Sequence, residues 1–172
     1  LSSHRIMARS PEIAIYGGSA SDAYDVRNWC RQQPGITSYS NSGVENKVMT
    51  DTDYFQWLAG FDAVVAAGSS NQKYDLVTPK YFEIASAGAL LIGQYCKDLD
   101  LLGFNESNAL LFTKETFLER VQAYRKAPEN YIAAREHGRA LIKQRHLITH
   151  RIELLKSLFN RHSTESSSCC KQ

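Results

Sequence analysis

The sequence lacks any apolar run close to the roughly 18 to 20 residues that a membrane-spanning helix requires. It also lacks an apolar core behind a basic N-terminal start, which is the form of a signal peptide. Cysteine is scarce: Cys30 and Cys96 stand alone, and Cys169 and Cys170 are adjacent. This spacing indicates neither a disulfide framework nor a zinc site. We therefore expect a cytoplasmic protein with free thiols and no transmembrane segment.

A strong charge of either sign is also missing. The formal net charge is +2 and the basic residues are dispersed, which argues against nucleic acid as a partner. The five histidines form no H-E-x-x-H pattern, and no third ligand accompanies His146 and His150 at their spacing of four. No G-x-S-x-G sequence marks a serine hydrolase. We expect no metal site, and the sequence leaves the catalytic residues unknown.

The length and composition fit one globular domain. The 172 residues are 43% hydrophobic and 22% charged, which is enough to bury a core without disulfides. We expect this domain to cover residues 12–162. Residues 1–11 are polar and irregular and predict a linker or the end of a preceding segment, whereas residues 163–172 lack periodicity and predict a flexible tail.

Short apolar runs alternate with helical patterns along the chain. The predicted strands are residues 12–16, 36–39, 61–67, 89–92 and 109–112, and residues 44–49 fit either an edge strand or a loop. The predicted helices are residues 20–33, 54–59, 80–87, 114–126 and 128–146, and a further helix carries a core-facing stripe of Ile148, Ile152, Leu155 and Phe159. This alternation predicts an α/β fold, a Rossmann-like doubly wound parallel sheet with a helical C-terminal end.

Local signals predict several helix ends. Asp53 and Gln56 resemble a capping box ahead of the helix that begins at Tyr54. Thr113 is suited to cap the helix that follows it. Residues 93–103 read as a connection without regular structure.

A glycine-rich turn follows the first predicted strand. Gly17, Gly18 and Ser19 lead directly into a helix, which is the general arrangement that cradles a phosphate. The turn is neither a G-x-G-x-x-G fingerprint nor a P-loop, so a dinucleotide or an ATPase site is disfavoured. A plain turn between a strand and a helix is the alternative interpretation.

The segment from residue 75 to residue 92 is the most informative part of the sequence. Thr78 is suited to the N-cap position, Pro79 to the first helical position and Gly88 to a left-handed C-terminal cap. Lys80 and Glu83 then share one face near the positive N-terminal end of the helix. Such a lysine suits a phosphate and such a glutamate suits a ribose diol. A solvated salt bridge between the two is the alternative.

The loop before this helix, residues 68–77, follows the carboxyl end of a buried strand. Open α/β sheets bind their ligands at that edge. A polar loop there can also be plain solvated surface.

The sequence TPKYFEIASAGALLI resembles the donor-site helix of retaining GT-B glycosyltransferases of the group 1 or CgeB-like set, whose pattern is K-x-F-E, small or apolar residues, glycine and an apolar strand. The segments LDLLGFNESNALLF and GRALIKQRHLITHR resemble the closing part of the same family, so the likeness covers about residues 54–159. In that family the glutamate, here Glu83, holds the ribose. An acidic residue eight positions earlier, here Asp75 and more usually glutamate, faces the sugar.

The resemblance implies the C-terminal, donor-binding half of a glycosyltransferase that transfers a hexose-type sugar, with retention, to a glycan or another acceptor. The nucleotide-diphosphate sugar is then the substrate and no cofactor is needed, while Lys80, Thr78 and the Gly17 to Ser19 turn lie near the diphosphate. A GT-B enzyme has two Rossmann-like halves, so we expect a piece of a longer protein whose N-terminal domain binds the acceptor. The alternative is a catalytically silent binding or scaffolding module. A flavodoxin-like regulatory domain is disfavoured because no paired aspartates follow the first strand.

Overall fold

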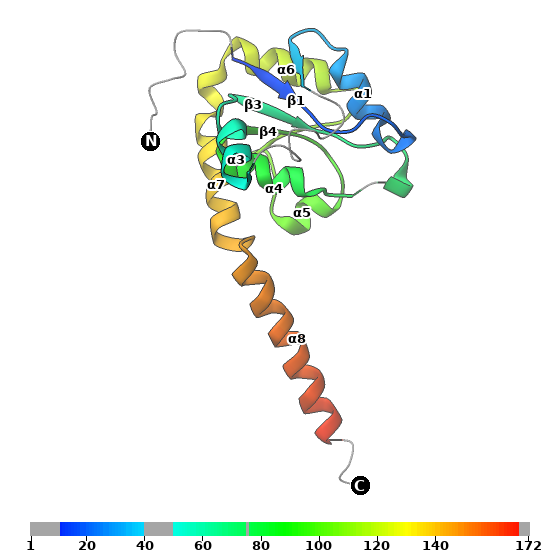
Figure 1. Cartoon of the computed structure of the whole chain (residues 1–172), viewed down its shortest axis with the longest axis vertical. Helices are drawn as coiled ribbons and strands as arrows, with labels where there is room; N and C mark the ends of the chain where they lie inside the picture. The colour runs from blue at the N-terminus through cyan, green and yellow to red at the C-terminus, as the bar shows by residue number, and fades with distance from the viewer. Residues whose placement is uncertain (1–10, 40–49, 75, 169–172) are drawn as a thin grey trace.

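The chain forms one parallel sheet covered by helices on both faces, in a computed structural model that describes residues 11–39, 50–74 and 76–168 (Figure 1). Five strands lie in the order β2-β1-β3-β4-β5, and every neighbouring pair is parallel. Their bounds are β1 Ile13–Ile15, β2 Ile36–Ser38, β3 Ala63–Ala66, β4 Leu90–Gln94 and β5 Leu110–Phe112. The predicted α/β fold class and its five strands are confirmed, with each strand trimmed or shifted by a few residues.

The strand order creates a switch point beside β1. From β1 the chain passes to β2 on one side and then to β3 on the other, so the segments that leave β1 and β3 diverge. A crevice of this kind at the carboxyl ends of the strands is where open α/β sheets bind ligands.

Alternate strand residues point to opposite faces of the sheet, and each face has its own helices. Ile13 and Ile15 pack with α1 (Asp25–Arg31) and α6 (Phe117–Lys126). Ala14 and Tyr16 face α3 (Asp51–Ala59) and α4 (Pro79–Ala87), with α5 (Asp98–Leu102) and α7 (Ile132–Arg145) on the same side (Figure 1). Three short 3-10 turns, η1 (Asp22–Tyr24), η2 (Gln72–Tyr74) and η3 (Pro128–Tyr131), connect these elements.

Helix α4 has the ends that the sequence predicts. Thr78 is the extended N-cap residue, although its side chain makes no capping hydrogen bond, and Pro79 occupies the first helical position. Gly88 ends the helix in the left-handed region with φ of 85°. Thr78, Pro79 and Gly88 set these limits, which place Lys80 in the first turn and Glu83 in the second.

Two other helix starts differ from the predictions. Helix α3 begins three residues early because the Thr50 hydroxyl accepts the Asp53 N–H at 3.2 Å, so the capping box at Asp53 is wrong. Helix α6 begins only at Phe117, because the Thr113 N–H donates to the Thr116 hydroxyl at 2.9 Å in a preceding turn. In both places a nearby threonine hydroxyl accepts the backbone N–H of the residue that was predicted to cap the helix.

Smaller differences concern two connections. The predicted helix from residue 20 begins as the turn η1, capped by Ser21, and becomes α-helical only at Asp25. The predicted connection at residues 93–103 contains the short helix α5, which Gly103 ends with φ of 84°. The ambiguous residues 44–49 lie outside the part of the chain that the structure describes.

The last helix, α8 (Ile148–Ser168), extends away from the body of the molecule (Figure 1). Its apolar stripe was predicted to be core and is not: Ile148 is 70% exposed and Phe159 is 71% exposed. Periodicity identifies an apolar face but not what covers it, which is why this prediction is wrong. The backbone is helical as far as Ser168, inside the predicted tail, and the domain limits stay a prediction. No helix in the described ranges is long and apolar enough to cross a membrane.

Candidate functional site

Arg27 joins the two loops that leave the switch point. Its side chain is only 4% exposed, and burial lowers the pKa of its guanidinium. Nε donates to the carbonyl of Ala67 after β3 at 2.8 Å, and Nη1 donates to the carbonyl of Gly18 after β1 at 3.1 Å. One side chain from α1 therefore fixes the distance between the two sides of the crevice.

The glycine-rich turn is held entirely by its carbonyls. Arg31 donates to the Gly17 carbonyl, Arg27 to that of Gly18, and Asn28 to that of Ser19 at 3.0 Å. Within the described ranges no residue accepts a hydrogen bond from the N–H groups of this turn. Consecutive N–H groups of this kind can bind an anion.

Lys80 lies directly against this turn. Its Nζ atom is 3.3 Å from the centroid of the Tyr16 ring, a distance at which the ring attracts a cation. Gly17 has φ of 102°, and a Cβ atom placed there would be 2.9 Å from the lysine Nζ. The structure thus brings together the turn after β1 and the first turn of α4.

Glu83 is joined to the same place through two tyrosines. The Tyr54 hydroxyl donates to Glu83 Oε2 at 2.8 Å, and the hydroxyls of Tyr54 and Tyr16 are 2.7 Å apart. Burial raises the pKa of Tyr16 well above its usual value, and the bond to Tyr54 raises it further. Tyr16 therefore stays a neutral phenol beneath Lys80, so the network carries one cation and one carboxylate at opposite ends.

The loop after β3 is also anchored at its start. Asp25 accepts hydrogen bonds from the Ser69 hydroxyl and from both the N–H and the hydroxyl of Ser70, at 2.6 to 2.8 Å. The Gln94 side chain accepts the Gly68 N–H and donates to the Ser69 carbonyl. The first residues of the 68–77 loop are therefore fixed to α1 and to β4 rather than freely solvated.

The sequence matches the glycosyl transferase-like family over residues 4–157, about nine-tenths of the chain. The chain belongs to this family. No curated protein matches it at a significant level.

Solved structures show that this glycosyl transferase-like chain has the fold of a C-terminal domain. The C-terminal domain of a glycosyl transferase group 1 family protein, LpcC, from Francisella tularensis is similar with a TM-score of 0.56 and 12% identity, over 80% of this chain and 87% of that one. TarM is similar with a TM-score of 0.55 and 11% identity, over 88% of this chain and 36% of that one. The predicted identification as the C-terminal half of a GT-B protein is confirmed, and the chain spans about a third of TarM.

The glycosyl transferase-like fold gathers most of the residues that the sequence singled out. Gly17, Lys80 and Glu83 belong to one connected group, with Gly18 and Ser19 in the same turn and Thr78 at the N-cap of α4. Asp75 lies outside the described residues, so its role stays a prediction.

Sequence reasoning missed Tyr16, Tyr54, Arg27 and Arg31, which hold this group in place. Tyr16 directly follows an all-apolar strand, and its hydroxyl was a signal that a polar partner must be buried nearby. For the two arginines no sequence pattern gave a signal, because their acceptors are backbone carbonyls of the turn after β1 and of the loop after β3.

Two histidines of this glycosyl transferase-like chain, His146 and His150, make structural contacts. His146 Nε2 lies 2.8 Å from the Leu102 carbonyl, and its ring stacks on Phe104. His150 Nδ1 accepts the Leu147 N–H near the start of α8. Among the residues that the structure describes, no group of three or more potential ligands could hold a metal ion.

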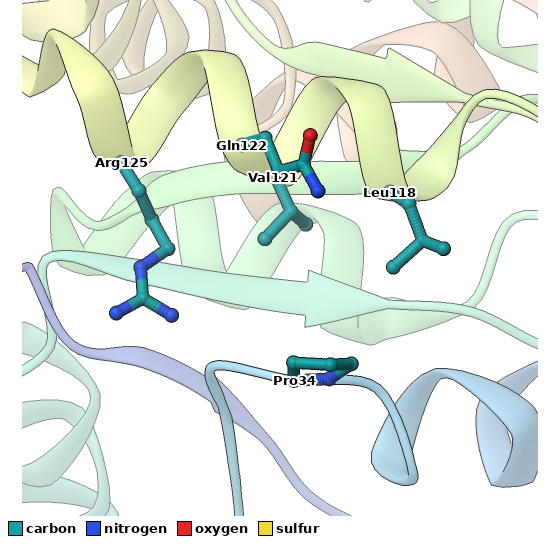
Figure 2. A pocket seen from close by; sticks show the side chains of 5 residues that line it. All are labelled: Pro34, Leu118, Val121, Gln122 and Arg125. Carbon is teal, nitrogen blue, oxygen red and sulfur yellow. The ribbon is translucent and has the colours of Figure 1, made fainter.

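A pocket of about 290 Å³ lies elsewhere, between α6 and the turn before β2. Figure 2 shows its lining, which is formed by Pro34, Leu118, Val121, Gln122 and Arg125. None of these residues belongs to the group around Lys80 and Glu83, so the pocket is not the candidate site.

Proposed function

We propose that this chain binds the nucleotide-diphosphate sugar of a glycosyltransferase at the carboxyl ends of β1 and β3. The reaction transfers a hexose-type sugar, with retention, to a glycan or another acceptor. One observation carries the proposal: Lys80, Glu83 and the Gly17 to Ser19 turn form one connected group at the switch point of the sheet. A solvated salt bridge would not need a glycine turn and two buried tyrosines around it.

In this proposal each part of the group meets one part of the donor. The N–H groups of Gly17, Gly18 and Ser19, the Lys80 ammonium and the N-terminal end of α4 bind the diphosphate. Glu83 accepts hydrogen bonds from the ribose hydroxyls, and Asp75 faces the sugar.

Lys80 and the N-terminal end of α4 also supply the chemical contribution of this half. Negative charge develops on the departing diphosphate, and Lys80 with the α4 N-terminus stabilises it where water is excluded. The acceptor and the closure of the site come from the N-terminal half of the whole protein. We therefore expect the chain alone to bind a nucleoside diphosphate weakly and to transfer no sugar, because such sites close between two domains. Robust sugar transfer by this chain alone would contradict the proposal that catalysis needs the N-terminal half as well.

Isothermal titration calorimetry with UDP, GDP, TDP and ADP sugars and a CMP sugar tests the proposal. Glu83→Ala should weaken binding of the preferred ribonucleotide about ten- to a hundredfold, through the loss of charge-assisted hydrogen bonds worth roughly 1.5 to 3 kcal/mol. Glu136→Ala, at an exposed position of α7, is the matched control and should change nothing. Equal affinities of wild type and a folded Glu83→Ala variant would remove the ribose role.

A further inference from the structure

The hydrogen bonds that end at Glu83 have a definite direction. A phenol carries a single hydrogen, and that of Tyr54 is donated to Glu83 Oε2 at 2.8 Å. The 2.7 Å contact between the two tyrosine hydroxyls therefore has Tyr16 as the donor and Tyr54 as the acceptor. Each donation strengthens the next one along the chain, so Tyr54 is a better donor to the carboxylate than an isolated phenol.

The two tyrosines are held rigidly. Tyr16 is 1% exposed and Tyr54 is 7% exposed, and the Trp57 ring contacts both. Tyr16 comes from the end of β1, Tyr54 from α3 and Glu83 from α4, so three separate elements fix the geometry. The carboxylate cannot change rotamer without breaking this partly buried hydrogen bond.

Only one oxygen of Glu83 is used in this way. Oε2 accepts from Tyr54, whereas no residue in the described ranges donates a hydrogen bond to Oε1. A carboxylate fixed through one oxygen presents its other oxygen in a defined direction, which is the condition for selective recognition of a ligand hydroxyl.

We propose that Tyr54 is a positioning residue that makes the site selective for ribose over 2′-deoxyribose, by occupying Oε2 of Glu83 and directing Oε1 at the ribose hydroxyls. This inference rests on the proposed function of Glu83. Without the Tyr54 hydroxyl, Glu83 keeps its charge but loses its fixed orientation. The ribose diol, which needs both hydroxyls aligned, then loses more binding than a sugar with one hydroxyl.

The test is Tyr54→Phe in the full chain, because phenylalanine keeps the packing and removes only the hydroxyl. Calorimetry compares UDP with 2′-deoxy-UDP and GDP with 2′-deoxy-GDP. Wild type should prefer the ribonucleotide, and Tyr54→Phe should weaken ribonucleotide binding about five- to tenfold while weakening 2′-deoxynucleotide binding by a smaller factor. Tyr95→Phe is the control: Tyr95 is 43% exposed and its hydroxyl donates to Asp100, which is not part of the site, so neither affinity should change.

Tyr16→Phe removes the first donor of the chain and provides a second variant if Tyr54→Phe does not fold. It should shift the ribose preference in the same direction by a smaller factor. The inference is overturned if folded Tyr54→Phe keeps the full preference for the ribonucleotide, or if its affinities for the ribonucleotide and the 2′-deoxynucleotide fall by the same factor. In either case a loss of binding in Glu83→Ala would still support the proposed function. If wild type binds none of these diphosphates, the proposed function fails and the inference fails with it.

Discussion

Gly17 occupies a position that no other residue fits. Its φ of 102° is one that side-chain-bearing residues rarely adopt, and a Cβ atom there would lie 2.9 Å from Lys80 Nζ. The absent side chain is what lets the ammonium lie against both the turn and the Tyr16 ring. A glycine at this place serves the ligand-facing surface as well as the backbone.

Gly17→Ala should therefore lower the free energy of unfolding by about 1 to 3 kcal/mol, because of backbone strain, and should also weaken nucleotide binding by displacing Lys80. Urea unfolding and calorimetry measure the two effects. Gly68→Ala is the control, because its nearest neighbour would be 3.9 Å away and its φ is not positive. Similar losses in the two variants would show that the closeness to Lys80 is irrelevant.

Asp25 provides a pH-dependent test of the anchored loop. Burial alone would raise the pKa of Asp25, but hydrogen bonds from Ser70 and Ser69 outweigh it and lower the pKa to about 2. The folded state therefore favours the carboxylate, and its stabilisation is present above the ordinary value of 3.8 and is lost as the pH falls toward about 2. Asp25→Asn should flatten the pH dependence of stability in that window, as measured by urea unfolding. An unchanged slope in the variant would mean that these hydrogen bonds do not stabilise the loop.

At the scale of elements, the sequence predicted a helix end correctly where only one residue nearby could form the cap. Pro79 and Gly88 set both ends of α4 to the residue, because a proline and a left-handed glycine have few other uses. At the start of α3, by contrast, Asp53 was the predicted cap, and the folded chain uses Thr50 instead. Strands were predicted well because apolar runs of that length have to be buried.

The candidate site follows the same rule. Glu83 and Lys80 could be singled out because both lie on one helix and match the K-x-F-E pattern of the family, and their roles stay a proposal. The partners of Glu83 were not, because Tyr16 and Tyr54 meet across distances in sequence that no local pattern reports.

Helix α8 shows the limit of periodicity and gives a prediction of its own. Because Ile152 is 44% exposed and Leu155 is 54% exposed, the double substitution Ile152→Glu and Leu155→Glu should leave the melting temperature of the body almost unchanged. Leu141→Ala in α7, where the side chain is buried in the core, should cost about 2 to 5 kcal/mol. Differential scanning calorimetry compares the two. A large drop in the α8 variant would mean that this face is covered in solution.

At the scale of the whole molecule, the candidate site contains residues from the sheet and from the helices on both of its faces. The sheet supplies the switch point, α1 holds both loops from one face, and α3 and α4 bring the tyrosines and the carboxylate from the other. Among the described residues, Lys80, Glu83 and the Gly17 to Ser19 turn are therefore already assembled in the free chain, while α8 extends away from the body (Figure 1).

The link that Arg27 makes between the two loops has a kinetic consequence. Its bonds to Gly18 and Ala67 are formed on folding, so the crevice does not have to be ordered when a ligand arrives. Association should then proceed at the rate of simple encounter, without a slow conformational phase, and affinity differences between nucleotides should reside in their dissociation rates. In an Arg27 variant this side chain no longer joins the loops after β1 and β3. The association rate itself should then fall, because the two loops must come together before the ligand can bind.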